Sequence, residues 1–352
     1  MTNAMTHPTV VIGAGLAGLA AARQLRAAGR SVVMLEKSRG LGGRLNTRRH
    51  LGTRADRGVP FLERQGSLTE AWLAEVERPC DLRSWPRQLH QLTAAGITVD
   101  SVADRFAIPA GLSSAAKVWA EGLTIVRGHR AIELVAPAQT GDPWTVRCDF
   151  PTAIDPADQQ DTWQAGAIVL AIPAPQAAEL LDPIAPDWAA AARLVAFDPC
   201  FSVTAAYGAD RPLTAPGLAG WQAIRTEISP DWRWLAREDS KSDDVAQPVV
   251  LLHSTAALAD RLWDAPDLAA VGRSLLDRAG ADTGLDLAQP DWVQVHRWRY
   301  AIVRNPLTDT CWVNPDRAIA VAGDWCAPHA AGRSLEAALQ SGQAAAAGLL
   351  SV

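Results

Sequence analysis

Residues 10–19 have the sequence VVIGAGLAGL, an apolar run that leads through three spaced glycines into an alanine-rich segment. A strand, a tight glycine turn and a helix in this order form the phosphate-binding unit of dinucleotide folds, in which the pyrophosphate lies at the helix N-terminus. One glycine makes the turn, one lets the backbone approach the phosphate, and one brings the helix close to the strand. The residues predicted to contact the pyrophosphate are Gly13, Gly15, Leu16, Ala17 and Gly18.

A second apolar run, residues 31–35, ends at Glu36, which follows Gly13 by 23 residues. A spacing of about 20 residues is typical of the acid that hydrogen-bonds the ribose hydroxyls of a dinucleotide. The negative charge of such an acid repels a 2′-phosphate. We therefore predict that Glu36 binds an adenosine ribose that lacks this phosphate.

The loop that follows Glu36 indicates that the dinucleotide is FAD rather than NAD. Residues 39–44, RGLGGR, combine three glycines with flanking arginines and look like a second pyrophosphate clamp. An ordinary strand–helix–strand crossover needs neither this loop nor the spaced acid. The sequence therefore predicts bound FAD, and the further residues expected to bind it are Lys37, Arg39, Gly43 and Arg44.

The composition is that of a globular protein with more than one packed unit. The 352 residues exceed the length at which single cores stop growing, and 48% of them are hydrophobic while 20% are charged. The net charge of −5 offers no electrostatic surface for nucleic acid. No apolar run approaches the roughly 18 residues of a membrane span, and residues 1–9 lack a cationic leader, so we expect a cytoplasmic protein.

Cysteine and histidine usage indicates neither disulfides nor a metal site. The five cysteines are scattered and odd in number, which fits a reducing compartment. The histidines show no metal-ligand spacing, so we expect no metal. The cysteines are Cys80, Cys148, Cys200, Cys311 and Cys326.

The pattern of elements along the chain predicts a cofactor domain built from separate segments. This FAD-binding domain is expected to comprise residues 1–60, 105–180 and 291–352, and a substrate-binding lobe residues 61–104 and 181–290. Helices are expected at 67–77, 113–121 and 268–279. Strands are expected at 123–127, 130–137, 144–149, 167–173, 202–207 and 249–253.

The C-terminal segment returns to cofactor chemistry. Residues 317–324, RAIAVAGD, form an expected buried strand whose terminal carboxylate can accept hydrogen bonds from a ribityl chain. A helix capped by Ser334 follows, and its N-terminus would stabilise negative charge that develops on a flavin ring. The predicted cofactor residues here are Gly323, Asp324, Ser334 and Leu335.

Several motifs together resemble one protein family. They are KSRGLGGR at 37–44, Asp56-x-Gly58, IPAGLS at 108–113, WRYA at 298–301, and GDW at 323–325 with GRSLE at 332–336. This combination resembles the renalase branch of the flavin amine oxidase superfamily. The resemblance implies a mixed α/β (α+β) fold of the GR2-type, p-hydroxybenzoate-hydroxylase-like class, with a Rossmann-type nucleotide domain and a mixed-sheet substrate lobe. It also implies that Asp56 and Gly58 line the cofactor.

The resemblance implies an FAD-dependent oxidase. A small planar electron donor, such as a 2- or 6-dihydro isomer of NAD(P)H, would transfer a hydride to flavin N5, and O2 would reoxidise the flavin to give hydrogen peroxide. Three alternatives stay open: an amine or amino-acid oxidase, a desaturase of a membrane-dissolved polyene, and a non-catalytic flavin scaffold or redox sensor. FAD is expected to be non-covalent, with a bond to Cys326 or His329 as the alternative. The sequence gives no oligomeric state.

One position departs from the family pattern. Renalase-like sequences continue Asp-x-Gly with Ala-Gln-Tyr-Phe, whereas here Gly58 is followed by Val59-Pro60-Phe61. Pro60 replaces an amide side chain and removes a backbone donor. The chain also has 14 tryptophans. Candidates for an aromatic substrate pocket, each with ordinary core packing as the alternative, are Trp221, Trp232, Trp234, Trp298 and Trp325. The pocket candidates are Trp298, Trp325, His296, Pro60 and Phe61, with His296 either a base or a satisfied strand residue.

Overall fold

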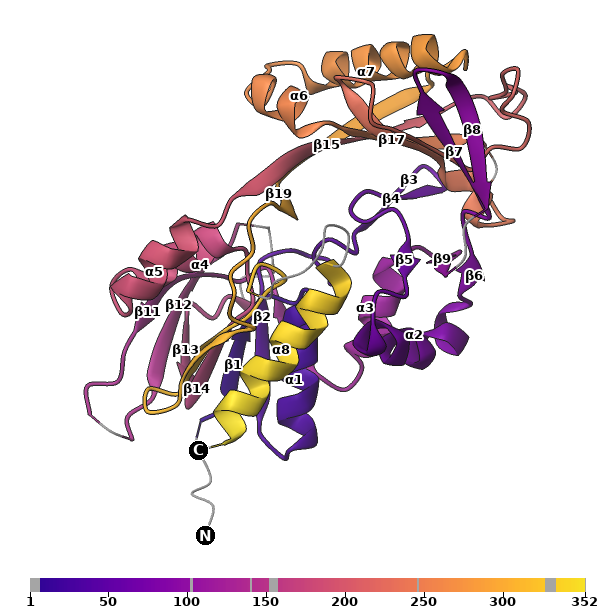
Figure 1. Ribbon diagram of the computed structural model, residues 1–352. Helices are drawn as coiled ribbons and strands as arrows, with labels where there is room; N and C mark the ends of the chain where they lie inside the picture. The colour runs from indigo at the N-terminus through magenta and orange to yellow at the C-terminus, as the bar shows by residue number, and fades with distance from the viewer. Residues whose placement is uncertain are drawn as a thin grey trace.

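Two large sheets lie in separate halves of the molecule. The computed structural model describes residues 7–101, 104–139, 141–151, 158–245, 247–326 and 334–351. The long strands β15 (Phe197–Ala206) and β19 (Trp292–Val303) lie in the upper sheet and extend toward the lower half (Figure 1). We call the half with the six-stranded sheet the cofactor domain and the half with the seven-stranded sheet the lobe.

The cofactor domain is a Rossmann-type unit. Its sheet has the strand order β10-β2-β1-β14-β21-β20, and all neighbours are parallel except the last pair. Helices α1 (Leu16–Ala27) and α8 (Ser334–Leu350) pack side by side against this sheet (Figure 1). The strands are β1 Thr9–Ile12, β2 Val32–Glu36, β10 Thr124–Arg127, β14 Ala167–Leu170, β20 Trp312–Asn314 and β21 Ile319–Val321.

Glycines permit the closest contacts of this domain. A Cβ on Gly18 would overlap the carbonyl oxygen of Gly13, so the turn and the first helical turn can meet only without a side chain there. In the same way, a Cβ on Gly342 would overlap the carbonyl oxygen of Ala17 where α8 crosses α1. The predicted packing role of Gly18 is therefore confirmed.

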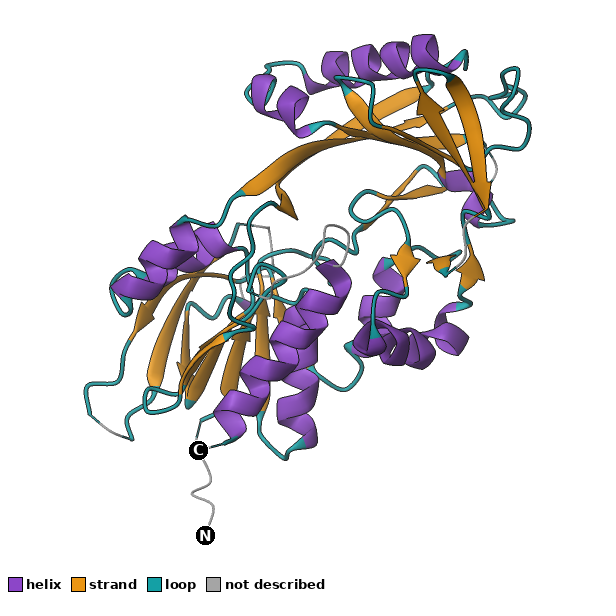
Figure 2. Cartoon of the chain, in the orientation of Figure 1, coloured by secondary structure: helices purple, strands orange, loops and turns teal. Residues whose placement is uncertain are grey.

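The lobe consists of a sheet with helices on one face. The strand order is β19-β15-β18-β17-β16-β7-β8, and α6 (Ala256–Arg261) and α7 (Leu268–Thr283) cover its outer face (Figure 2). Phe201 and Val203 point into the core beneath these helices. The alternate residues face the cofactor domain, where Ala206 of β15 contacts Ala55. The remaining strands are β7 Gln88–Thr93, β8 Gly96–Ser101, β16 Ala223–Thr226, β17 Trp232–Arg237 and β18 Val249–Ser254.

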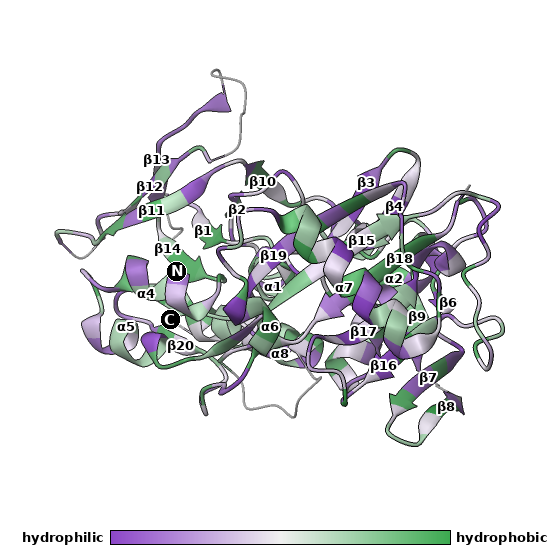
Figure 3. Ribbon diagram, turned by 90° about the horizontal axis from the view of Figure 1, so that it is seen from above, coloured by the Kyte–Doolittle hydropathy of each residue, from purple (hydrophilic) through white to green (hydrophobic). Residues whose placement is uncertain are grey.

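Smaller elements surround the two sheets. The 3-10 helix η2 (Glu238–Lys241) joins β17 to β18, and the antiparallel sheet β11-β12-β13 projects from the side of the molecule away from β7 and β8 (Figure 3). The other strands are β3 Thr47–His50, β4 Thr53–Asp56, β5 Leu62–Glu63, β6 Arg83–Ser84, β9 Arg105–Ala107, β11 Arg130–Val135, β12 Trp144–Asp149 and β13 Thr162–Ala165. The other helices are α2 Ser67–Cys80, α3 Ser113–Trp119, α4 Ala174–Leu181 and α5 Pro186–Arg193.

Most elements that the sequence predicts are present, with shifted ends. The predicted helix at 268–279 continues to Thr283, and the predicted strand at 202–207 begins at Phe197. The predicted strand at 317–324 is confirmed only over Ile319–Val321. Strand β15 is longer than predicted because β19 pairs with it from Phe197 to Ala206, whereas β18 pairs only with Ser202–Ala206. The residue pattern of β15 does not reveal the longer pairing.

Part of each of two predicted segments lies in the other half from the one predicted. The rest of 291–352, with β20, β21 and α8, lies in the cofactor domain, and β7 and β8 of 61–104 lie in the lobe. We placed 291–352 in the cofactor domain, but β19 hydrogen-bonds to β15 at the edge of the lobe sheet. We placed 61–104 in the lobe, but α2 packs against α3 and α8, with Trp72 and Leu73 in the core of the cofactor domain. In the first case β19 satisfies the backbone hydrogen bonds at the edge of β15, and in the second case α3 and α8 cover the apolar side chains of α2. In both cases the partner is distant in sequence.

Candidate cofactor and active site

The two glycine loops lie side by side at the carboxyl ends of β1 and β2. Gly42 donates a backbone hydrogen bond of 2.8 Å to the carbonyl of Ala14, and Gly15 and Gly42 form a parallel bridge. Glu36 joins them, because one carboxylate oxygen accepts from the amide of Ala14 at 2.9 Å and the other from Ser38 at 2.8 Å. Thus the predicted ribose ligand also shapes the loops, while Lys37 and Arg39 are exposed beside them.

The open space at Gly15 fits a dinucleotide phosphate. Among the described residues, no heavy atom lies within 4 Å of the position that a Cβ on Gly15 would occupy, and no side chain caps the N-terminus of α1. Unsatisfied amides and the helix dipole at such an N-terminus favour an anion. The residues around this loop are therefore compatible with the pyrophosphate of FAD.

Arg44 connects the second glycine loop to the C-terminal motif. Its guanidinium donates to Asp324 at 2.6 Å and to the carbonyl of Ala301 at 3.1 Å. Burial disfavours the charged form of Arg44, but Asp324 more than offsets this effect and raises its pKa. Asp324 is 2% exposed, so this pair holds a buried carboxylate next to the predicted ribityl site.

A linking segment, which we define as Asp56–Phe61, packs directly on Arg44. The amide of Val59 donates to the carbonyl of Arg44 at 3.0 Å, and the amide of Arg57 donates to the carbonyl of Asn46 at 2.9 Å. A Cβ on Gly58 would overlap the carbonyl oxygen of Arg44. Gly58 therefore permits the close approach between the linking segment and the second cofactor loop.

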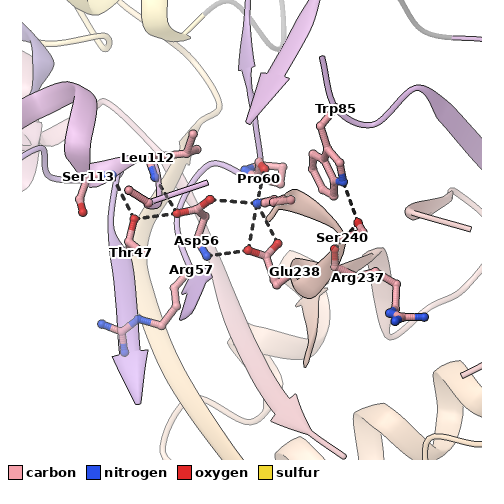
Figure 4. Close-up of polar contacts among 12 residues, drawn as sticks. Thr47, Asp56, Arg57, Pro60, Trp85, Leu112, Ser113, Arg237, Glu238 and Ser240 are labelled. Carbon is pink, nitrogen blue, oxygen red and sulfur yellow. Dashed lines mark hydrogen bonds and ion pairs between the residues drawn. The ribbon is translucent and has the colours of Figure 1, made fainter. Parts of the chain in front are cut away.

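Asp56 occupies the centre of a buried polar cluster (Figure 4). Its Oδ1 accepts from the Thr47 hydroxyl at 2.7 Å and the Leu112 amide at 2.9 Å, and its Oδ2 accepts from Lys241 Nζ at 2.9 Å. The Asp56 amide donates to Glu238 at 2.8 Å. Because both carboxylate oxygens bind groups of the chain, this geometry favours a supporting role for Asp56, and its predicted contact with FAD stays a prediction.

Lys241 links this cluster to the linking segment. It donates to the carbonyl of Pro60 at 2.8 Å, lies 2.9 Å from both carboxylate oxygens of Glu238, and lies over the ring of Trp85. Burial raises the pKa of Glu238 to about 7, although Lys241 opposes the shift; Asp56 contributes to it. Pro60, the residue that departs from the family pattern, is thus anchored through its carbonyl.

The lobe sheet holds the linking segment from above. Trp298 Nε1 donates to the carbonyl of Arg57 at 2.8 Å, and His253 Nε2 lies 3.3 Å from the same oxygen. His296 lies edge-on to Trp298, with ring centroids 4.6 Å apart. Burial lowers the pKa of His253 to about 3 and that of His296 to about 4, so both are neutral near pH 7.

Of the residues predicted to form an aromatic pocket, Trp325 lies elsewhere, and the role of the others stays a prediction. Trp298 and His296 lie on the lobe face that contacts the linking segment, and Phe61 packs against Trp234 at 5.5 Å between ring centroids. The Trp325 indole instead donates to the carbonyl of Ile172 and lies in the core of the cofactor domain. Trp325 directly follows Asp324 in sequence, yet its indole binds Ile172 whereas the Asp324 carboxylate binds Arg44.

The N-terminus of α8 is engaged by α2 and the residues before it. The amides of Leu335 and Glu336 donate to Gln65 Oε1 at 3.1 and 3.2 Å. In return, the Glu336 carboxylate accepts from the Leu68 and Thr69 amides at the start of α2. The helix begins at Ser334, and the predicted motif residues His329, Gly332 and Arg333 lie outside the described residues. The predicted flavin contacts of Ser334 and Leu335 stay predictions.

Sequence reasoning missed four residues that shape this site. The missed residues are Gln65, Glu238, Lys241 and His253. One signal was available: the chain has 33 cationic residues, and Lys241 is one of only three lysines among them. No local pattern distinguishes the other three.

Two family models match the chain. A NAD(P)-binding Rossmann-like domain matches residues 11–75, and a flavin-containing amine oxidoreductase matches residues 111–350. The chain belongs to the flavin-containing amine oxidoreductase family. As a member of this family it is an FAD-dependent oxidoreductase, and the predicted cofactor and fold class are confirmed. The renalase branch is not distinguished by these matches.

Similar proteins include amine oxidases. AofH of Mycobacterium tuberculosis, provisionally named a flavin-containing monoamine oxidase, is 45% identical over 79 residues, which are 21% of this chain and only 17% of that protein. A putrescine oxidase with bound putrescine has a TM-score of 0.72 at 13% identity and covers 98% of this chain and 99% of its own. Cyclohexylamine oxidase from Brevibacterium oxydans IH-35A has a TM-score of 0.67 at 14% identity, with the same coverage. The two structural likenesses support the fold.

The part of the chain that the structure describes contains no helix long and apolar enough to cross a membrane. The same residues contain no group of three or more His, Cys, Asp or Glu side chains with the geometry of a metal site. Within the described residues, Cys326 is buried in the core of the cofactor domain, and burial raises the pKa of its thiol.

Proposed function

We propose that this family member oxidises a small, planar, uncharged donor ring, such as that of a 2- or 6-dihydronicotinamide. Bound FAD would accept the hydride at N5 and pass the electrons to O2, which yields hydrogen peroxide. The chain's own residues would bind and orient the donor and exclude water. The non-covalent cofactor would lie between the glycine loops, the Arg44–Asp324 pair and the linking segment.

The charge distribution around the linking segment carries this proposal. His253 and His296 are neutral, and Trp298 presents an aromatic ring. Among the described residues, the Arg57 guanidinium hydrogen-bonds only to the neutral Asn46 side chain, and burial and the nearby Arg48 lower its pKa. An ammonium ion would be repelled here, whereas a neutral ring can stack on an aromatic face.

The carboxylates beside the linking segment do not favour a cation either. Asp56 and Glu238 both bind Lys241, and each also accepts a backbone amide. A substrate ammonium would have to displace Lys241 to gain either partner. No proton needs to be removed from a dihydronicotinamide before hydride transfer, so neutral histidines with low pKa values are sufficient for this donor.

An amine oxidase is the second candidate, and the family match and the putrescine and cyclohexylamine oxidases of similar fold favour it. The FAD-loaded protein would be mixed anaerobically with 2- and 6-dihydro-NAD(P) isomers in one series and with mono-, di- and cyclic amines in another. Fast loss of flavin absorbance with the isomers alone, and peroxide release in air, is the expected result. Reduction by amines alone would reject the proposal, and reduction by neither series would point to a scaffold or sensor.

A further inference from the structure

Lys241 is buried at the boundary between the two halves of the molecule, and its four partners come from both. Its side chain is 4% exposed, whereas Lys37 and Lys117 are exposed. We propose that Lys241 and Glu238 are positioning residues for the cofactor, which hold the linking segment against the second glycine loop. This inference rests on FAD binding between the glycine loops, the Arg44–Asp324 pair and the linking segment. It does not depend on the identity of the electron donor.

An unbroken series of contacts leads from Lys241 to the cofactor loops. Lys241 donates to Asp56 at 2.9 Å and to the carbonyl of Pro60 at 2.8 Å, so it holds the linking segment at two points. Between these points, Val59 donates to the carbonyl of Arg44. Arg44 in turn donates to Asp324. A displacement of Pro60 would therefore be transmitted to the loop that is expected to hold the pyrophosphate and ribityl chain.

The geometry of Glu238 complements that of Lys241. Its Oε2 accepts from both the Asp56 amide and Lys241 Nζ, while its Oε1, although 2.9 Å from Nζ, is not aligned for a hydrogen bond. Oε1 is buried, and Arg54 Nε is also buried and has no partner within the part of the chain that the structure describes. Both residues line one small cavity, together with Ala55, Asp56, Ile108, Pro109, Gly111 and Lys241. An acceptor and a donor on one cavity wall suit a bridging water molecule.

The cluster changes its charge when Glu238 is protonated. With all groups ionised, Asp56, Glu238 and Lys241 carry one net negative charge; protonation of Glu238 makes the cluster neutral. Among the described residues, the charged groups that face Glu238 are Lys241 on its own helix and Asp56 and Arg54 on β4, while the β9–α3 loop contributes Ile108, Pro109 and Gly111. Glu238→Gln keeps the shape and the Oε2 acceptor, and its amide stands in for the protonated acid.

The first test uses chemical rescue of Lys241→Ala. We expect FAD dissociation constants, measured by flavin fluorescence, to rise about tenfold, the usual range for coupled sites, and the visible flavin spectrum to shift. Millimolar methylammonium should restore both, because it can occupy the space of the lost ammonium, whereas tetramethylammonium cannot donate hydrogen bonds and should restore neither. Lys117→Ala is the matched control. Wild-type protein with methylammonium reports any reduction of the flavin by the amine itself.

The second test uses Glu238→Gln, which conserves the size and most contacts of the side chain. In wild-type protein the flavin spectrum and FAD affinity should change across neutral pH, and in Glu238→Gln this dependence should be lost. Glu227→Gln, an exposed position in the same lobe, is the control. Unchanged affinity and spectrum in Lys241→Ala would overturn the proposal. So would a folded Lys241→Ala that methylammonium does not rescue, or, if that variant does not fold, a Glu238→Gln with wild-type pH dependence. None of these readouts uses a donor, so failure here is distinguishable from failure of the proposed function.

Discussion

Arg44 donates a 2.6 Å hydrogen bond to Asp324 across 280 positions of sequence. The first residue ends the second glycine loop, and the second follows the last parallel strand of the cofactor sheet. Each belongs to a separate predicted cofactor motif, and the pair joins the two motifs into one wall. The linking segment then packs on the carbonyl of Arg44, so three cofactor motifs meet at this residue.

Asp324→Asn should weaken FAD binding. The substitution leaves the Arg44 guanidinium without its counter-charge, and the loss of a charged hydrogen bond of this kind costs about 1.5–3 kcal/mol, or about tenfold to a hundredfold in affinity. FAD content after gel filtration and a fluorescence titration of the apoprotein would measure it. Asp182→Asn, which removes an exposed ion pair with Arg193, should change neither. Equal FAD affinities of Asp324→Asn and Asp182→Asn would refute the role of the Arg44–Asp324 pair in cofactor binding.

Gly15→Ala and Gly18→Ala should separate cofactor binding from folding. A Cβ on Gly15 meets no atom of the residues that the structure describes, so the apoprotein should keep its melting temperature. FAD binding should fall at least about tenfold, because the methyl group enters the phosphate space. A Cβ on Gly18 overlaps Gly13, so the apoprotein itself should lose about 1–3 kcal/mol. Calorimetry of both apoproteins and FAD titrations distinguish the two effects. Normal FAD affinity in Gly15→Ala would contradict the assignment of the loop.

Trp298→Phe should slow flavin reduction, whereas Trp325→Phe should not. Trp298 donates to the Arg57 carbonyl at 2.8 Å, and the loss of that bond, worth about 0.5–1.5 kcal/mol, should lower the rate constant with the correct donor by about two- to tenfold. Trp325 donates to Ile172 within the core of the cofactor domain, so its replacement should affect mainly stability. Anaerobic stopped-flow and thermal unfolding measure the two effects. A larger kinetic effect of Trp325→Phe would show that our placement of the donor is wrong.

Acidification below about pH 6.5 should destabilise the fold through its buried imidazoles. The folded-state pKa values of His253 and His296 are lowered to about 3 and about 4, so the unfolded chain binds protons that the folded chain excludes. Their contribution to stability is therefore present above the unfolded pKa near 6.5 and is lost as the pH falls toward the folded values. Melting temperatures between about pH 7.5 and 5 should decline less steeply in His253→Gln than in wild type. Parallel curves of melting temperature against pH for the two proteins would exclude His253 as a cause of the acid destabilisation.

The contribution of Glu238 to stability depends on pH in the opposite direction to that of the two histidines. Its folded-state pKa of about 7 lies above the value of a free glutamate, so its contribution to stability is complete below about pH 4.5 and is lost as the pH rises through 7. Glu238→Gln should therefore flatten the decline in melting temperature on the neutral side of the profile. Glu227→Gln serves as the exposed control, and a flattened curve in that variant as well would rule out a specific effect of Glu238.

The sequence by itself determined the cofactor domain wherever the chemistry is local. The glycine turn of residues 13–18, Glu36 at the end of the next strand and the loop at 39–44 depend on backbone freedom and fixed spacing, which neighbouring residues impose on one another. Only the tertiary structure decided which distant groups meet: Arg44 with Asp324, Lys241 with Asp56 and Pro60, and Gln65 with the start of α8. It also placed Trp298 beside the linking segment and Trp325 in the core, although both adjoin a motif. The reason is physical: buried charges and amides need partners, and folding brings those partners from parts of the chain that share no sequence pattern.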